Sequence, residues 1–146
     1  MIVQQATLEK VVSMSARTSH ATQVDADAIR SEFERVQARA KGVAMLLLST
    51  ADGRAVADWT HARLDPRRVS AMTNSFLTLG ETLAKEVGMS AADHATISTA
   101  HGSLVVIRIN GARPYTLAVL GDQQATLAVL LFAARECAAR IRDRLF

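Results

Sequence analysis

The fold is decided by residues 43–57, which read VAMLLLSTADGRAVA. The first six of these residues, Val43 to Leu48, are continuously apolar, as is typical of a strand that is buried on both faces. The pair Asp52-Gly53 is a strong turn signal, and it precedes a second extended run over Arg54 to Thr60. The pattern predicts a central strand that turns sharply into an outer strand.

A long helical pattern follows this hairpin. Asp65 can cap the helix, and Pro66 suits its first position because the N–H that proline lacks would be unpaired there. The pattern continues to about Val87, and Gly88 ends it. Asn110-Gly111 further along predicts a type I′ hairpin turn between two strands. Three extended runs are expected after the helix, at His94–Thr99, Ser103–Ile109 and Arg113–Leu120.

The two ends of the pattern are also helical. Asp25 can cap a first helix that Lys41-Gly42 ends, and Asp122 can cap a last helix whose apolar positions extend from Leu127 to Leu145. The expected order is α-β-β-α-β-β-β-α. This order predicts an α/β (α+β) domain with a five-stranded antiparallel sheet and helices on both of its faces.

Length and composition fit one domain. The 146 residues are 49% hydrophobic and 21% charged, which is ordinary for a globular protein. Residues 1–23 are polar, so we expect a flexible N-terminal tail followed by a single domain over residues 24–146. The apolar runs are too short to span a membrane and no secretory signal is evident, so a cytoplasmic location without membrane insertion is expected. The net charge of +3 comes from scattered arginines, which does not predict nucleic-acid binding.

The middle helix carries two apolar stripes. The stripe of large side chains is expected to pack on the sheet: Val69, Met72, Phe76, Leu79, Leu83 and Val87. A second stripe holds smaller residues: Thr73, Leu77, Gly80, Ala84 and Gly88. Glycine at position 80 costs about 1 kcal/mol relative to alanine, and close approach of a second helix is the simplest reason to keep it. We therefore expect a homodimer seam at the second stripe, the alternative being cover by a loop or the tail of the same chain.

The sequence assembles no catalytic constellation. No glycine-rich phosphate loop occurs, and the four histidines lack the spacing of metal ligands. The single cysteine, Cys137, excludes a disulfide within the chain and is expected to be a buried small hydrophobe. No catalytic residue, metal or cofactor is therefore expected. Binding to other proteins is favoured over an enzymatic activity.

Four features together resemble the roadblock/LC7 family over about residues 25–143. They are the order of elements, the segment from Leu46 to Ala57, the Asp-Pro start of a long middle helix, and the passage from Gly121-Asp122 into an apolar last helix. The resemblance implies a profilin-like fold that dimerises through its middle helices and third strands. Bacterial members similar to MglB bind small Ras-like GTPases of the MglA type, and can stimulate hydrolysis without donating catalytic residues.

Carried over to this chain, the resemblance implies a homodimeric adaptor or regulator of a small Ras-like GTPase. The dimer interface would comprise Thr73, Leu77, Gly80 and Ala84. The partner-binding face of the paired helices would comprise Asn74, Ser75, Thr78, Glu81 and Lys85. The alternative is a small-molecule-sensing domain in a signalling pathway, because profilin-like sheets also underlie ligand sensors. That alternative predicts a pocket between the sheet and a helix.

Overall fold

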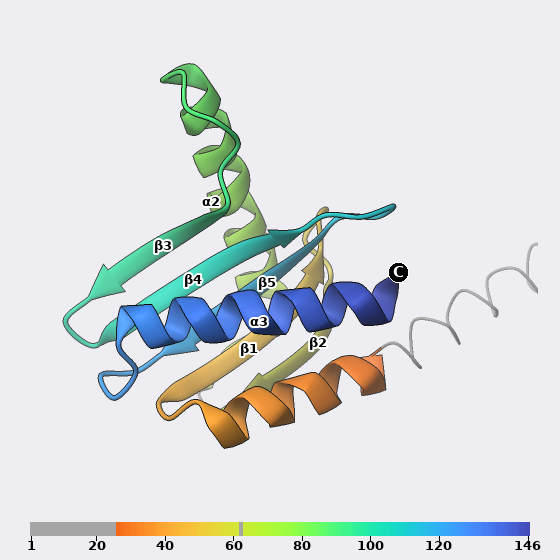
Figure 1. Ribbon diagram of the computed structural model, residues 1–146, viewed down its shortest axis with the longest axis vertical. Helices are drawn as coiled ribbons and strands as arrows, with labels where there is room; N and C mark the ends of the chain where they lie inside the picture. The colour runs from red at the N-terminus through yellow and green to blue at the C-terminus, as the bar shows by residue number, and fades with distance from the viewer. Residues whose placement is uncertain (1–25, 62) are drawn as a thin grey trace, which may run out of the picture.

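The computed structural model describes residues 26–61 and 63–146, and over them the predicted order of elements is confirmed (Figure 1). The expected tail over residues 1–23 and the expected cap Asp25 lie outside the described residues. A first helix covers residues 26–39. It is followed by β1 (Val43–Thr50), β2 (Ala55–Thr60), α2 (Pro66–Glu86), β3 (His94–Thr99), β4 (Gly102–Ile109), β5 (Tyr115–Gly121) and α3 (Leu127–Leu145).

The five strands form one antiparallel sheet in the order β2-β1-β5-β4-β3. β1 lies inside the sheet between β2 and β5, and residues Met45 to Ser49 of this strand are buried. The apolar run of the sequence is therefore an interior strand, and its partner across the Asp52-Gly53 turn is the edge strand β2, as predicted. The other edge is β3.

Two local predictions are wrong. Ile109 pairs with Tyr115, which leaves a five-residue loop, and neither Asn110 nor Gly111 has a positive φ, so a type I′ turn does not close this hairpin. The cap of α3 is Thr126, whose side chain accepts a hydrogen bond from the Val129 N–H, rather than Asp122. The carboxylate of Asp122 instead accepts from the Gln124 N–H at 2.8 Å and shapes the turn before the helix.

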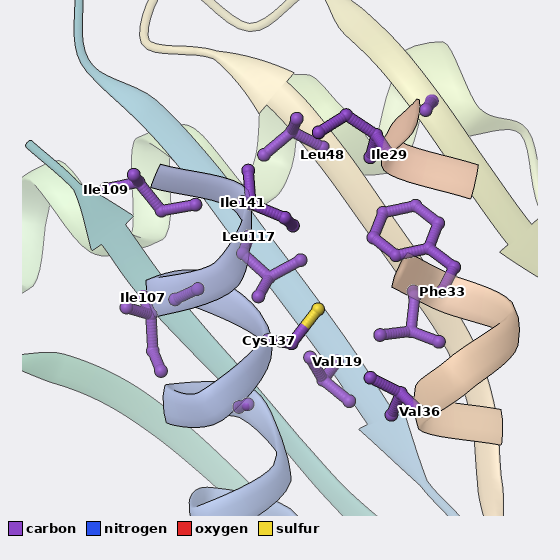
Figure 2. Packing of buried hydrophobic residues seen from close by; sticks show 14 of the residues in the cluster. Ile29, Phe33, Val36, Leu48, Ile107, Ile109, Leu117, Val119, Cys137 and Ile141 are labelled. Carbon is purple, nitrogen blue, oxygen red and sulfur yellow. The ribbon is translucent and has the colours of Figure 1, made fainter. Parts of the chain in front are cut away.

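The larger core lies between the sheet and two helices that pack side by side on it, the first helix and α3 (Figure 1). Figure 2 shows Phe33 of the first helix and Ile141 of α3 converging over Leu117 of β5. All three side chains are fully buried. Burial stabilises the fold by roughly 1.5–3 kcal/mol for each such side chain, which makes this layer the main source of stability.

Within the described residues, helix α2 is the one helix on the opposite face of the sheet. It contacts all five strands, and its C-terminal end extends past the β3 edge of the sheet (Figure 1). The core under α2 is accordingly small. Its buried members are Met45, Leu47, Leu77, Val106 and Ala118.

Candidate interaction surface

Helix α2 has the predicted ends. The side chain of Asp65 accepts a hydrogen bond from the Arg67 N–H at 3.1 Å, and Pro66 occupies the first turn. At the other end Gly88 has φ +76, a left-handed conformation that glycine adopts without strain. The Met89 N–H then bonds the Ala84 carbonyl at 2.9 Å, which closes the helix.

The prediction for the faces of α2 is wrong. The small-residue stripe faces the sheet of the same chain: Leu77 is fully buried, Thr73 and Ala84 nearly so. Most of the large-residue stripe faces outward, with Met72, Leu79 and Leu83 each about 60–70% exposed. The residues expected to form a dimer seam, Thr73, Leu77, Gly80 and Ala84, are therefore already used inside the protomer.

The small-residue stripe is buried in place of the large-residue stripe because α2 lies close to the sheet. A Cβ built at Gly80 would lie 3.8 Å from the Cβ of Ala95 on β3, so the backbone of α2 lies close to the sheet and leaves no room for long side chains there. Amphipathicity alone predicted that the largest apolar residues are buried. Only the side chains that fit a close helix–sheet contact are buried in fact.

The exposed apolar stripe forms a surface that residues 26–61 and 63–146 leave uncovered. Its residues recur at helical spacing along one flank of α2 and continue past the helix end: Met72, Phe76, Leu79, Leu83, Val87 and Met89. Phe76 is half-buried and the others are exposed. At about 100° per residue, this flank lies roughly 100° around the helix from the buried stripe. A contiguous apolar surface of this kind indicates an interaction site.

A corner of the sheet on the α2 side is also uncovered. A depression of about 360 Å³ opens there, lined by the apolar side chains of Ile97 on β3, Leu104 on β4 and Leu120 on β5. Ile97 lies on the edge strand and is 44% exposed. The projecting end of α2 and this uncovered corner therefore lie near the same edge of the sheet (Figure 1).

A buried polar network anchors α2 to the sheet, and the predicted partner-binding residue Asn74 belongs to it. The Asn74 amide donates to Ser49 Oγ and to the Ser70 carbonyl, both at 2.8 Å. Its oxygen accepts from Thr116 Oγ1 at 2.6 Å and from Arg108 at 3.1 Å. Asn74 is 5% exposed, so the expectation that it faces a partner is wrong.

Arg108 is the charged member of this network. Its guanidinium donates to Glu81 Oε1 at 2.7 Å, to Thr78 Oγ1 at 3.3 Å and also to Thr116 Oγ1. The side chain of Arg108 is 10% exposed and that of Glu81 33% exposed, which makes this a largely buried ion pair. The carboxylate of Glu81, another predicted partner-binding group, is thus engaged inside the protomer.

Sequence reasoning missed this network, although a signal was present. Arg108 interrupts the apolar run of β4, and Ser49 and Thr116 interrupt those of β1 and β5. All three point to the α2 side of the sheet, since they alternate with residues of the larger core. The network and Leu77 fill the space between sheet and α2 where a small-molecule sensor would hold its ligand.

The remaining predicted partner-binding residues, Ser75, Thr78 and Lys85, are exposed. Ser75 and Thr78 line an open depression of about 500 Å³ between α2 and the β1–β2 turn. Asp52 of that turn also lines it. The hydrogen bond from the Thr50 hydroxyl, together with the nearby Arg54 guanidinium, lowers the pKa of Asp52. The depression therefore has one ionised carboxylate at its margin.

Cys137 is buried, as predicted. Burial raises the pKa of its thiol to about 12, which makes it a poor nucleophile at neutral pH. Within residues 26–61 and 63–146, no group of three or more His, Cys, Asp or Glu side chains is arranged to hold a metal ion. No helix in that part of the chain is long and apolar enough to cross a membrane.

Solved structures with the same architecture identify the fold. MglB of Myxococcus xanthus superposes with a TM-score of 0.70 at 18% identity, over 80% of this chain and 86% of that one. A roadblock/LC7 domain from Streptomyces avermitilis gives 0.68 at 18% identity, over 77% and 92%. This chain has the roadblock/LC7 fold. The prediction made from the Leu46–Ala57 segment, the Asp-Pro helix start and the last helix is thereby confirmed.

The roadblock/LC7 fold is related to that of profilin, and this chain shows the relation. Profilin IB of Acanthamoeba castellanii superposes with a TM-score of 0.52 at 9% identity, over 72% of this chain and 89% of that one. The profilin-like character expected from the sequence is confirmed. No protein-family model matches the sequence, and no curated protein is significantly similar to it.

Proposed function

We propose that this roadblock/LC7 chain is a homodimeric adaptor without enzymatic activity that binds a small Ras-like GTPase and modulates its GTP hydrolysis. The proposal rests on the α2 flank described above and on the similarity of the fold to MglB of Myxococcus xanthus and the gliding protein MglB of Thermus thermophilus. The second of these superposes with a TM-score of 0.69 at 15% identity, over 82% of this chain and 91% of that one.

The observation that carries the dimer is the match between two uncovered surfaces. Leu83, Val87 and Met89, at the C-terminal end of α2, are each about 60–70% exposed, and Ile97, which lines the depression at the corner of the sheet, is 44% exposed. In a two-fold dimer, each projecting helix end covers the corner of the other copy. In an isologous contact of this kind, the helix end of each copy packs on the sheet corner of the other, so both surfaces are covered in both copies.

The seam can be tested by placing a charge on the exposed stripe. Leu83→Asp should convert the dimer to a monomer, because a carboxylate buried in an apolar seam loses its hydration without gaining a partner. Thr82→Asp is the matched control, since Thr82 is an exposed neighbour outside the stripe. Light scattering coupled to size-exclusion chromatography reports the mass. A monomeric wild-type chain, or a dimer that persists in Leu83→Asp, would contradict the proposed seam.

The partner surface is the rest of the exposed face of α2. With the seam on one flank, Ser75, Thr78 and Lys85 remain on the outward and opposite sides, next to the depression at the β1–β2 turn. Polar and charged side chains around a shallow depression suit a partner that binds and dissociates in a regulated way. We place the GTPase there.

The GTPase arm is tested with a purified small Ras-like GTPase from the same genome, loaded with GDP or with a non-hydrolysable GTP analogue. Affinity is measured by calorimetry and hydrolysis by phosphate release. Ser75→Arg should abolish binding by steric clash, and the control Ala128→Arg, on the exposed face of α3, should not. If the chain binds the GTPase in neither nucleotide state and the hydrolysis rate is unchanged, the GTPase assignment is wrong. The dimer is tested separately by Leu83→Asp.

A further inference from the structure

A second apolar surface lies on the opposite side of the sheet from α2. It is a groove of about 290 Å³ between the first helix and α3, which run side by side there (Figure 1). Val36 and Cys137 line the buried part of the groove, while Val129 and Phe132 of α3 stand beside it. Phe132 is 70% exposed, the most exposed large hydrophobic residue in the described part of the chain.

The charges around the groove are mostly positive. Arg35, Arg39 and Arg140 line it together with a single carboxylate, that of Glu136. Arg140 donates a hydrogen bond to this carboxylate at 2.9 Å. The Arg39 guanidinium lies 4.0 Å from it, beyond hydrogen-bond distance.

Arg35 is no better paired. The nearest oxygen of Glu32, Oε2, lies 3.9 Å from Arg35, beyond hydrogen-bond distance, and the other oxygen, Oε1, accepts a hydrogen bond from Arg144 at 2.8 Å. Two of the three arginines at the groove therefore have guanidinium donors left for an anionic partner.

The walls of the groove determine what kind of segment fits it. Both walls are helices whose backbone hydrogen bonds are internal, so no strand can be added to them. A third helix packs into the groove between two neighbouring helices by inserting its apolar side chains. A flat lipid surface cannot fill a concave groove, although it could contact Phe132 and the arginines.

We propose that this groove is a docking site for an amphipathic helix of another protein, with apolar residues on one face and glutamate or aspartate on the flanks. The apolar face would pack against Phe132 and Val36, and the acidic flanks would pair with Arg39 and Arg35. The site is separate from the α2 surface, so a chain bound through α2 could hold a second partner here at the same time.

The chain's own N-terminal residues are the competing occupant, and their charge does not suit the site. Residues 1–25 contain two acidic side chains, Glu9 and Asp25, and two basic ones, Lys10 and Arg17. This segment has no excess of negative charge to complement the arginines, whereas an acidic helix has.

The test uses the full chain and a fluorescein-labelled helical peptide with leucines at i, i+3, i+4 and i+7 and glutamates elsewhere. Fluorescence anisotropy should show binding of this peptide, and a version with lysine for every glutamate should bind at least ~10-fold more weakly. Phe132→Ser should weaken binding of the acidic peptide by a similar factor. Arg39→Glu should weaken the acidic peptide and strengthen the lysine peptide.

Arg113→Glu is the matched control, because it makes the same charge change at an exposed position in the β4–β5 loop. It should leave both affinities unchanged. Circular dichroism checks that each variant folds. The proposal is overturned if the acidic peptide does not bind, if the two peptides bind equally, or if Phe132→Ser has no effect.

Two further outcomes would assign the groove to another occupant and overturn the proposal. If Val11→Asp in the full chain raises the affinity for the acidic peptide, the N-terminal segment competes for the groove. If vesicles of phosphatidylcholine and phosphatidylserine bind the chain and Phe132→Ser abolishes that binding, the surface is a lipid contact. The expected results are no change in affinity for Val11→Asp and no vesicle binding.

Discussion

At the scale of single residues, what surrounds a side chain decides its role more than its type does. Gly80 stood out in the sequence because glycine is unfavourable inside a helix, and Cys137 was expected to be a buried small hydrophobe. In the structure, a Cβ at Gly80 would lie at ordinary van der Waals distance from Ala95, and Cys137 lies in the larger core. Both environments lead to measurable consequences.

Replacing Gly80 with alanine should stabilise the protein. The added Cβ meets the Cβ of Ala95 at 3.8 Å, and alanine is favoured over glycine inside a helix, so we expect a gain of about 0.5–1 kcal/mol in the free energy of unfolding. Urea denaturation measures it. Gly42→Ala is the contrasting variant, because φ is +89 there and the Cβ would approach the Ala125 nitrogen to 2.7 Å. A loss of stability in Gly80→Ala would contradict an ordinary van der Waals contact between positions 80 and 95.

The buried thiol of Cys137 should make stability depend on pH in the alkaline range. Its pKa is raised from an ordinary 9.0 to about 12, so the unfolded chain releases this proton at lower pH than the folded chain does. The contribution is complete below pH 9.0 and is lost as pH rises toward about 12, by at most about 1.4 kcal/mol per pH unit. Urea denaturation across this range should show a shallower decline for Cys137→Ala. Equal slopes for the two proteins would contradict the assignment.

At the scale of elements, the sequence predicted what the elements are better than how they face one another. Hydrophobic periodicity and turn residues located all eight elements, because these signals are local. The faces of α2 were assigned wrongly because their burial depends on how near the helix lies to the sheet, which is a tertiary property. The seam residues Thr73 and Leu77, and the partner residue Asn74, were misplaced for the same reason.

The polar network under α2 should behave as a coupled unit. Arg108→Met leaves the Glu81 carboxylate without its partner, and we expect a loss of about 1–3 kcal/mol. Glu81→Leu alone removes the carboxylate that balances the charge of a largely buried guanidinium, which should also destabilise the fold. The double variant should lose less than the sum of the two. Urea denaturation of all four proteins completes the cycle, and additive losses would show that the pair is not energetically coupled.

At the scale of the whole molecule, the two faces of the sheet are covered unequally. In the described part of the chain, the first helix and α3 cover one face, and α2 is the one helix across the other (Figure 1). Apolar side chains of α2 and of the sheet corner are exposed. This asymmetry explains why part of the apolar surface remains outside the two cores. It also separates the proposed dimer and GTPase surfaces, on the α2 side, from the proposed helix-binding groove on the other.

If a second copy covers the α2 side, thermal stability should depend on protein concentration. Dimerisation that is lost on unfolding stabilises the folded state by mass action, so Tm should rise as the chain is concentrated. Leu83→Asp should remove this dependence and lower Tm to the value that wild type approaches on dilution, because Leu83 is exposed in the protomer and its replacement leaves both cores intact. Thr82→Asp should keep the concentration dependence. Calorimetric scans over a wide range of protein concentrations measure this dependence of Tm. A wild-type Tm that does not change with concentration would indicate that the exposed stripe binds a partner other than a second copy.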